Sequence, residues 1–249
     1  MRRAFSSGVR QANTAKFYIS VFLTILLIFA GSTKDLIRAL REHALLPAGF
    51  GITFLKNALT TDAVVSFLPI IAVLPFSGVY VNDIKSMFSR FCLIRSNYRD
   101  YLWSRFWVCF ITGGGAILLG VLLSWGLSAL LFLPMEKAAE KGAVSDIQLF
   151  PLFSLFFFSG GLWAVLGMTM STIMESKYIA YASPFIVYYL LVILYERYFP
   201  DAWLLYPKNW LNPEIWPYGI GSAVLFLLEL TFLCGLVFYV RGKRRLEQL

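Results

Sequence analysis

Long apolar segments alternate with short polar ones along most of the chain. A transmembrane helix needs roughly 20 predominantly apolar residues to cross the hydrocarbon core of a bilayer. Six segments approach or exceed this length: 17–31, 63–81, 106–133, 149–174, 178–195 and 219–240. The pattern predicts an all-α polytopic membrane protein with six transmembrane helices, built as a single transmembrane domain over residues 1–249.

The first segment, 17–31, is the shortest and could extend outward through residues 36–40. An apolar run behind a basic start also resembles the core of a signal peptide. No small-residue cleavage site follows it cleanly, whereas five more apolar segments do follow. We therefore interpret it as a retained first span.

Prolines and glycines interrupt several segments. Pro69 and Pro75 in the second and Pro184 in the fifth each remove a backbone hydrogen bond, so we expect bends there. The runs 113–115 and 160–161 are glycine, which predicts close helix packing in the third and fourth segments more than a hinge.

Composition agrees with membrane insertion. Apolar residues make up 59% of the 249 residues and charged residues only 14%, against about 25% charged in ordinary soluble domains. These values exclude a soluble enzyme, a disordered tail and a disulfide scaffold.

The distribution of charge predicts the orientation. The ends of the chain, the 82–105 loop and the 175–177 turn together carry 14 basic and four acidic residues, whereas the opposite loops carry eight and nine. Basic residues collect in cytoplasmic loops, so both termini are predicted to be cytoplasmic. The same rule explains the net charge of +8 without nucleic acid.

Two segments outside the spans have patterns of their own. Residues 1–16 place Phe5, Val9 and Ala12 near one face of a helix, which favours an interfacial helix over a frayed basic tail. The external stretch 196–217 combines four prolines with three tryptophans. We expect short broken re-entrant helices in the outer leaflet there, with a plain external loop as the alternative.

Catalytic and metal-binding patterns are absent from the sequence. The chain has one histidine, His43, and three cysteines, which form neither an HExxH helix nor a CxxC pair. The run 113–115 lacks the GK[ST] ending of a phosphate-binding loop. We therefore expect no catalytic residue, no metal and no cofactor on this chain, and no ATP site.

Glu229 is the one acidic residue clearly inside a predicted span. Intramembrane acids are costly and often functional. It could receive a cationic or proton-donating group of a substrate, or hydrogen-bond a tyrosine on a neighbouring helix. The sequence leaves both interpretations open.

The cytoplasmic loop after the second segment has an amphipathic pattern. Ile84, Met87, Phe88 and Phe91 follow the i, i+3, i+4, i+7 spacing of one helical face, with basic residues between them. Such a helix can pack on the membrane or against a partner protein.

In this loop, and in the order of its segments, the sequence resembles the membrane subunits of ABC-2-type exporters. Asp83, Lys85, Ser86 and Arg105 occupy positions comparable to an acid, a base, a small residue and a final base in that family. One departure is Ser86, where many members carry glycine. Compact chains of this size look like the exporters of bacteriocins and phenol-soluble-modulin-type toxins.

The resemblance implies two sets of site residues. A coupling helix would dock on a separate ATPase subunit, which binds ATP and Mg, through Asp83, Lys85, Met87, Phe88, Arg90, Phe91, Arg95 and, in a second contact, Glu175. A substrate cavity between two permease copies would be lined by Phe67, Phe76, Tyr80, Tyr181, Tyr188 and Tyr189.

The function implied is export of a small amphipathic peptide out of a bacterial cell. The chain would lie in the plasma membrane, in contact with membrane lipids. Three alternatives remain: the same machine acting on a lipid, glycolipid or drug, a secondary transporter or channel without an ATPase, and a membrane scaffold.

Overall fold

The computed structural model describes residues 2–12, 14–41, 46–47, 49–89, 92, 97–136 and 149–247. Over these ranges the chain is helical, with an isolated bridge between Leu46 and Glu136 and no strand. The predicted all-α class is confirmed.

The helices follow one another along the chain with few long connections. The α-helices are α1 (Arg2–Ala12), α2 (Ala15–Gly31), α3 (Thr33–Arg41), α4 (Phe50–Leu59), α5 (Asp62–Val73), α6 (Val79–Lys85), α8 (Tyr98–Phe132), α9 (Leu149–Met174), α10 (Lys177–Ile193) and α11 (Ile220–Leu246). Short helical turns are η1 (Leu133–Met135), the π-helical η2 (Leu194–Tyr198), η3 (Trp203–Leu205), η4 (Asn209–Leu211) and η5 (Pro213–Ile215).

Four of these helices are long and apolar enough to cross a membrane: α8, α9, α10 with η2, and α11. Two bent pairs could each form one further span. The angle is 57° between α1 and α2 and 67° between α4 and α5. The structure therefore has four to six helices of spanning character, and the count of six stays a prediction.

The predicted second span, 63–81, is not one helix. Helix α5 ends at Val73, a turn covers residues 74–78, and α6 begins at Val79. Pro75 and Gly78 lie in this turn, where proline removes a hydrogen-bond donor and glycine weakens a helix. The sequence interpretation also missed α4, an apolar helix in the stretch that we took for an external connection.

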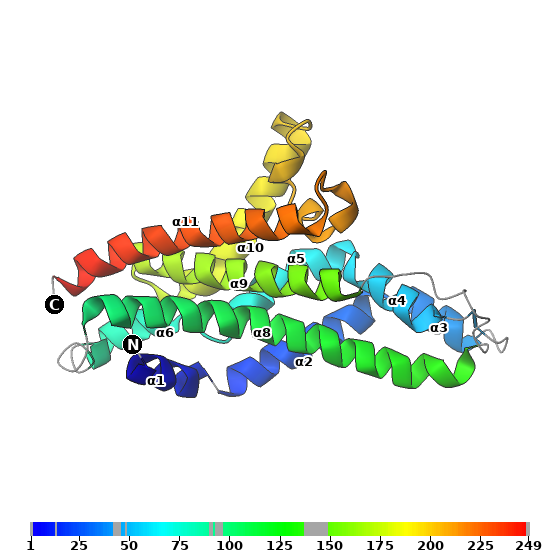
Figure 1. Cartoon of the computed structure of the whole chain (residues 1–249), viewed down its shortest axis with the longest axis horizontal. Coiled ribbons are helices and arrows are strands. Elements are labelled where there is room, and N and C mark those ends of the chain that lie inside the picture. The colour runs from blue at the N-terminus through cyan, green and yellow to red at the C-terminus, as the bar shows by residue number, and fades with distance from the viewer. Residues whose placement is uncertain are drawn as a thin grey trace.

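Helices α8, α9 and α11 run side by side along the long axis of the molecule, and α2 lies against α8 (Figure 1). Both termini lie at the same end of this bundle (Figure 1). Helix α10 leaves the bundle at a steep angle, so that η2 projects from its side (Figure 1).

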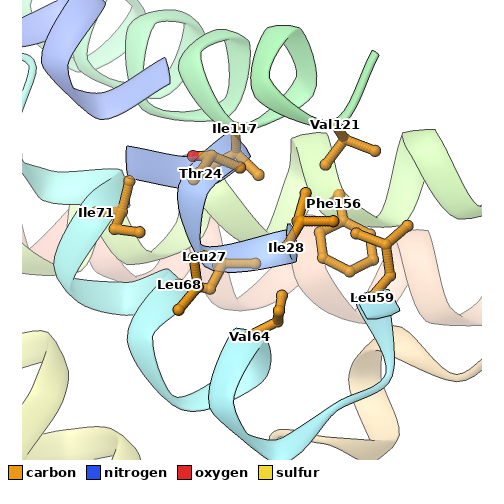
Figure 2. A pocket seen from close by; sticks show the side chains of 10 residues that line it. All are labelled: Thr24, Leu27, Ile28, Leu59, Val64, Leu68, Ile71, Ile117, Val121 and Phe156. Carbon is orange, nitrogen blue, oxygen red and sulfur yellow. The ribbon is translucent and has the colours of Figure 1, made fainter. Parts of the chain in front are cut away.

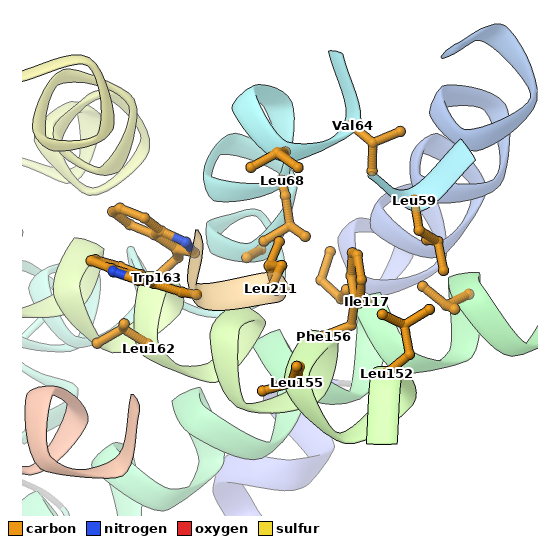
Figure 3. Close-up of a cluster of buried hydrophobic side chains, with 14 of the residues drawn as sticks. Leu59, Val64, Leu68, Ile117, Leu152, Leu155, Phe156, Leu162, Trp163 and Leu211 are labelled. Atoms are coloured by element: carbon orange, nitrogen blue, oxygen red, sulfur yellow. The ribbon is translucent and has the colours of Figure 1, made fainter. Parts of the chain in front are cut away.

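Glycines allow the close crossing of α8 and α9. A Cβ atom built on Gly113 would lie 2.3 Å from the Cβ of Ala164, and one on Gly114 would lie 2.5 Å from the carbonyl oxygen of Phe157. Around this crossing, α5, α8, α9 and η4 contribute one cluster of buried side chains that includes Leu68, Ile117 and Leu211 (Figure 3). The glycine runs therefore pack helices, as the sequence predicted.

Helix α1 confirms the helix expected at the N-terminus and packs on α8. Phe5 and Ala12 face the bundle, whereas Val9 is exposed. A Cβ on Gly8 would lie 3.0 Å from a methyl group of Val108. One edge of α1 is thus bound to protein and the other is free to meet the interface.

The segment before α11 consists of the short broken helices that its prolines predicted. The indole nitrogen of Trp210 donates to the carbonyl oxygen of Leu204 at 2.7 Å, and that of Trp216 donates to Asn209 at 3.0 Å. Trp210 also stacks on Trp163 of α9, with ring centroids 5.8 Å apart. The position of this segment relative to the outer leaflet stays a prediction.

Candidate coupling site

A buried ion pair lies at the end of the bundle that holds both termini. Asp83 of α6 and Arg105 of α8 meet at 2.7 Å between Oδ2 and Nη2, and their side chains are only 7% and 2% exposed. The hydroxyl of Tyr101 donates a second hydrogen bond to the same carboxylate oxygen at 3.0 Å. Buried charges persist when they are paired and hydrogen-bonded, and this pair meets both conditions.

Arg105 also reaches α1. Its Nη1 donates to the side-chain oxygen of Gln11 at 2.6 Å, and its guanidinium lies over the rings of Phe76 and Tyr101 at 5.7 and 5.1 Å. Its Nε has no hydrogen-bond partner in the described part of the chain. Three elements that are distant in sequence, α1, α6 and α8, thus converge on one arginine.

Burial raises the pKa of Asp83 above its ordinary value, and the positive charge of Arg105 and the hydrogen bond from Tyr101 oppose that shift. Removal of Arg105 would leave only the hydrogen bond from Tyr101 to oppose the effect of burial on this carboxyl.

The position of Asp83 is internal to the bundle. It lies in the last turn of α6, where the helix dipole disfavours a carboxylate, and the contacts with Arg105 and Tyr101 oppose this effect. The residue is 5% exposed and cannot touch a docked partner in this conformation. Its contacts instead fix α6 against α8.

A second arginine–carboxylate pair ties the turn between α9 and α10 to α11. Arg245 Nη2 lies 2.9 Å from Glu175 Oε2, and its Nη1 donates to the carbonyl oxygen of Thr172 at 3.3 Å. Helix α6 also reaches α11, because the Tyr80 hydroxyl donates to the carbonyl oxygen of Gly242 at 3.3 Å. The two segments that we expected to contact the ATPase, α6 with the loop after it and the turn at Glu175, are therefore both connected to α11.

Met87 and Glu175 have left-handed backbones, with φ of 59° and 58°. Among the described non-glycine residues they alone have positive φ, a conformation that is uncommon for side chains of this kind. Both side chains are exposed. Strained residues of this kind concentrate at functional sites.

The other predicted coupling residues fall into two groups. Lys85 is exposed, as Met87 is, whereas Phe88 is half-buried. Among the predicted coupling residues of this loop, Lys85 and Met87 are therefore the described side chains that a partner could contact. Arg90, Phe91 and Arg95 lie outside the described residues.

Sequence reasoning missed Gln11, Tyr101 and Arg245 as members of this site. The spacing of Tyr101 and Arg105, four residues apart on α8, places both on one helical face and could have indicated a shared partner. Gln11 and Arg245 carry no comparable local signal.

The six aromatic residues expected to line a cavity between two copies have different surroundings within one copy. Phe76 and Tyr80 belong to the buried cluster near Arg105, and Tyr188 belongs to the cluster around Trp163. They cannot contact a substrate in this conformation, because neighbouring side chains cover them. Tyr181 is half-buried and accepts a hydrogen bond from Lys16 at 3.1 Å. Phe67 and Tyr189 are exposed on α5 and α10.

A small apolar cavity lies elsewhere, between α2, α4, α5, α8 and α9 (Figure 2). Its volume is about 10 Å³, and its lining includes Thr24, Leu68 and Phe156 but none of the six aromatics. This is room for roughly one water molecule and not for an exported substrate.

Glu229 is exposed on α11. Within the described residues no hydrogen bond or ion pair reaches its carboxylate, so the bond to a neighbouring tyrosine that we considered is not present.

Comparison with protein-family models, with curated proteins and with solved structures finds no match for this chain.

Proposed function

We propose that this chain is the membrane subunit of an ATP-driven exporter of the ABC-2 type, energised by a separate ATPase subunit at the end of the bundle that holds both termini. The proposal joins the order of segments in the sequence to the geometry of that end. Four to six spanning helices provide the membrane part, and the chain carries no phosphate-binding loop of its own.

One observation carries the proposal. The two loops that the resemblance assigns to the ATPase both expose a left-handed residue, Met87 or Glu175, and both are tied to long helices by an arginine. A displacement of the first loop would move α8 through Arg105, and a displacement of the second would move α11 through Arg245. This is the connectivity that transmission from a docked ATPase requires.

In this proposal a second copy of the chain packs beside α10. Only 22% of the apolar spanning stretch of α10 is buried within the molecule, compared with 61% for that of α9. Helix α10 also leans out of the bundle (Figure 1). Exposed Phe67 and Tyr189 would then face a space between two copies, where aromatic side chains suit an amphipathic substrate such as a small peptide.

Export of a lipid, glycolipid or drug would use the same architecture, and the aromatic surface does not favour it over a peptide. A secondary transporter usually needs paired charges at depth, and Glu229 is the one acid placed there. The proposed location is a bacterial plasma membrane with both termini in the cytoplasm.

The docking role is tested by placing a charge on the exposed side chain of Met87. The tagged Met87→Asp variant is purified from its native host in mild detergent, and the bound P-loop ATPase is quantified. We expect a several-fold loss of bound ATPase. Ile215→Asp, a change at a similarly exposed position in η5 far from the cytoplasmic loops, should leave the amount unchanged. Equal amounts in both variants would contradict docking at Met87.

A further inference from the structure

The outer face of α11 presents an acid at the middle of an apolar surface. Glu229 lies nine residues after Ile220 and twelve before Arg241 on this helix, distances of about 14 and 18 Å at a rise of 1.5 Å per residue. A hydrocarbon core is about 30 Å thick. The carboxyl group therefore lies near the bilayer midplane, if α11 crosses the membrane as proposed.

The surroundings of Glu229 on this face are apolar and uncovered. Leu225, Phe232 and Leu233, one turn before and one turn after it, are each more than half exposed. The opposite face, with Leu227 and Thr231, is buried in the bundle. Lipid tails can pack against the leucines, but they offer no hydrogen bond to a carboxyl group, and burial of such a group without a partner is unfavourable.

Among the residues that the structure describes, none offers a cation that could meet Glu229. The basic residues in α2, α8, α10 and α11 lie within about two turns of a helix end. A second copy would carry its basic residues at the same depths and so could not place one at the midplane.

We infer that the outer face of α11 binds a membrane-spanning helix of a different protein, one that presents a lysine or arginine to Glu229 at the middle of the bilayer. Apolar contacts along Leu225, Phe232 and Leu233 would supply the packing, and the carboxylate would set depth and partner choice. This inference concerns a face that the proposed coupling site does not use, and it requires only that α11 spans the membrane.

A synthetic leucine-rich transmembrane helix with one central lysine is the probe. The chain, fused at its C-terminus to a fluorescent protein, is reconstituted in phosphatidylcholine vesicles, and energy transfer to a dye on the peptide is measured over a range of peptide densities. The comparison peptide carries leucine in place of the lysine. We expect the lysine peptide to associate about tenfold more tightly, which corresponds to roughly 1.4 kcal/mol.

Variants of the chain assign the effect. Glu229→Leu should bind both peptides equally, whereas Glu247→Leu, which removes an exposed acid beyond the end of the same helix, should keep the tenfold preference. Equal binding of the two peptides to the unmodified chain would overturn the inference, as would a preference that survives Glu229→Leu. Self-association of the chain that Glu229→Leu abolishes would also overturn it, because the occupant would then be a second copy.

Discussion

Arg105 shows how one residue can organise the end of a helical bundle. Its guanidinium is almost fully buried, and it binds the carboxylate of Asp83, the amide of Gln11 and two aromatic rings. A buried pair of this kind adds little net stability over apolar side chains of similar volume, but removal of one partner leaves the other charge unpaired. Its role is therefore to specify how α1, α6 and α8 meet.

This arrangement changes what Asp83→Ala is expected to do. From the sequence, the change should uncouple ATP hydrolysis from transport and leave the spans folded. Because the carboxylate is buried against Arg105, we now expect Asp83→Ala to lower the stability of the chain by about 3 kcal/mol or more. Thermal unfolding of the purified chain in mild detergent measures the loss.

The double variant Asp83→Ala/Arg105→Leu is the matched control. It removes both charges, so it should regain most of the lost stability. A double variant no more stable than Asp83→Ala alone would show that the packing of these side chains, and not the unpaired charge, sets the cost.

At the residue scale, the sequence indicated the individual residues better than their partners. Asp83 and Arg105 were both marked by the resemblance to ABC-2-type exporters, but their 2.7 Å contact depends on the turn at residues 74–78, which separates α6 from α5. A break whose angle is set by tertiary packing leaves no periodic signal. The buried state of Phe76 and Tyr80, in and after this turn, was missed for the same reason.

At the scale of elements, the crossing of α8 and α9 depends on side chains that are absent. Gly113 and Gly114 face α9 at distances that exclude a Cβ atom, whereas the adjacent Gly115 faces open space. Neighbouring glycines in one run thus have opposite surroundings, which follows from the 100° rotation between successive residues of a helix.

Alanine substitutions along this run should affect stability differently at the packed and the open positions. Gly113→Ala would force the two helix backbones apart, and we expect a loss of about 1–3 kcal/mol of stability, as in overpacked cores. Gly115→Ala should be neutral or should stabilise the helix by up to about 1 kcal/mol. Thermal unfolding of both variants in the same detergent makes the comparison, and equal losses would contradict the proposed crossing.

The elements themselves were predicted unevenly. Segments 106–133, 149–174, 178–195 and 219–240 fall within or nearly coincide with observed helices, because a long apolar run has few alternatives in a membrane. Helix α4 was missed since its ten residues are too short to be identified as a span.

At the scale of the whole molecule, the chain has a well-packed centre and apolar surfaces that a single copy leaves open. These surfaces include the leaning α10 and the outer face of α11. Hydropathy predicted the membrane class and the all-helical fold. It could not predict which helices would be exposed, because a lipid-facing helix and a partner-facing helix share the same apolar composition.

The central claim is that a separate ATPase energises this chain. The most direct measurement is purification of the tagged chain from its native host in mild detergent, with identification of the bound proteins and an assay of ATP hydrolysis. The account predicts a stoichiometric P-loop ATPase that hydrolyses ATP in the complex. A clean preparation without such an ATPase, from a host that encodes none near this chain, would contradict the account.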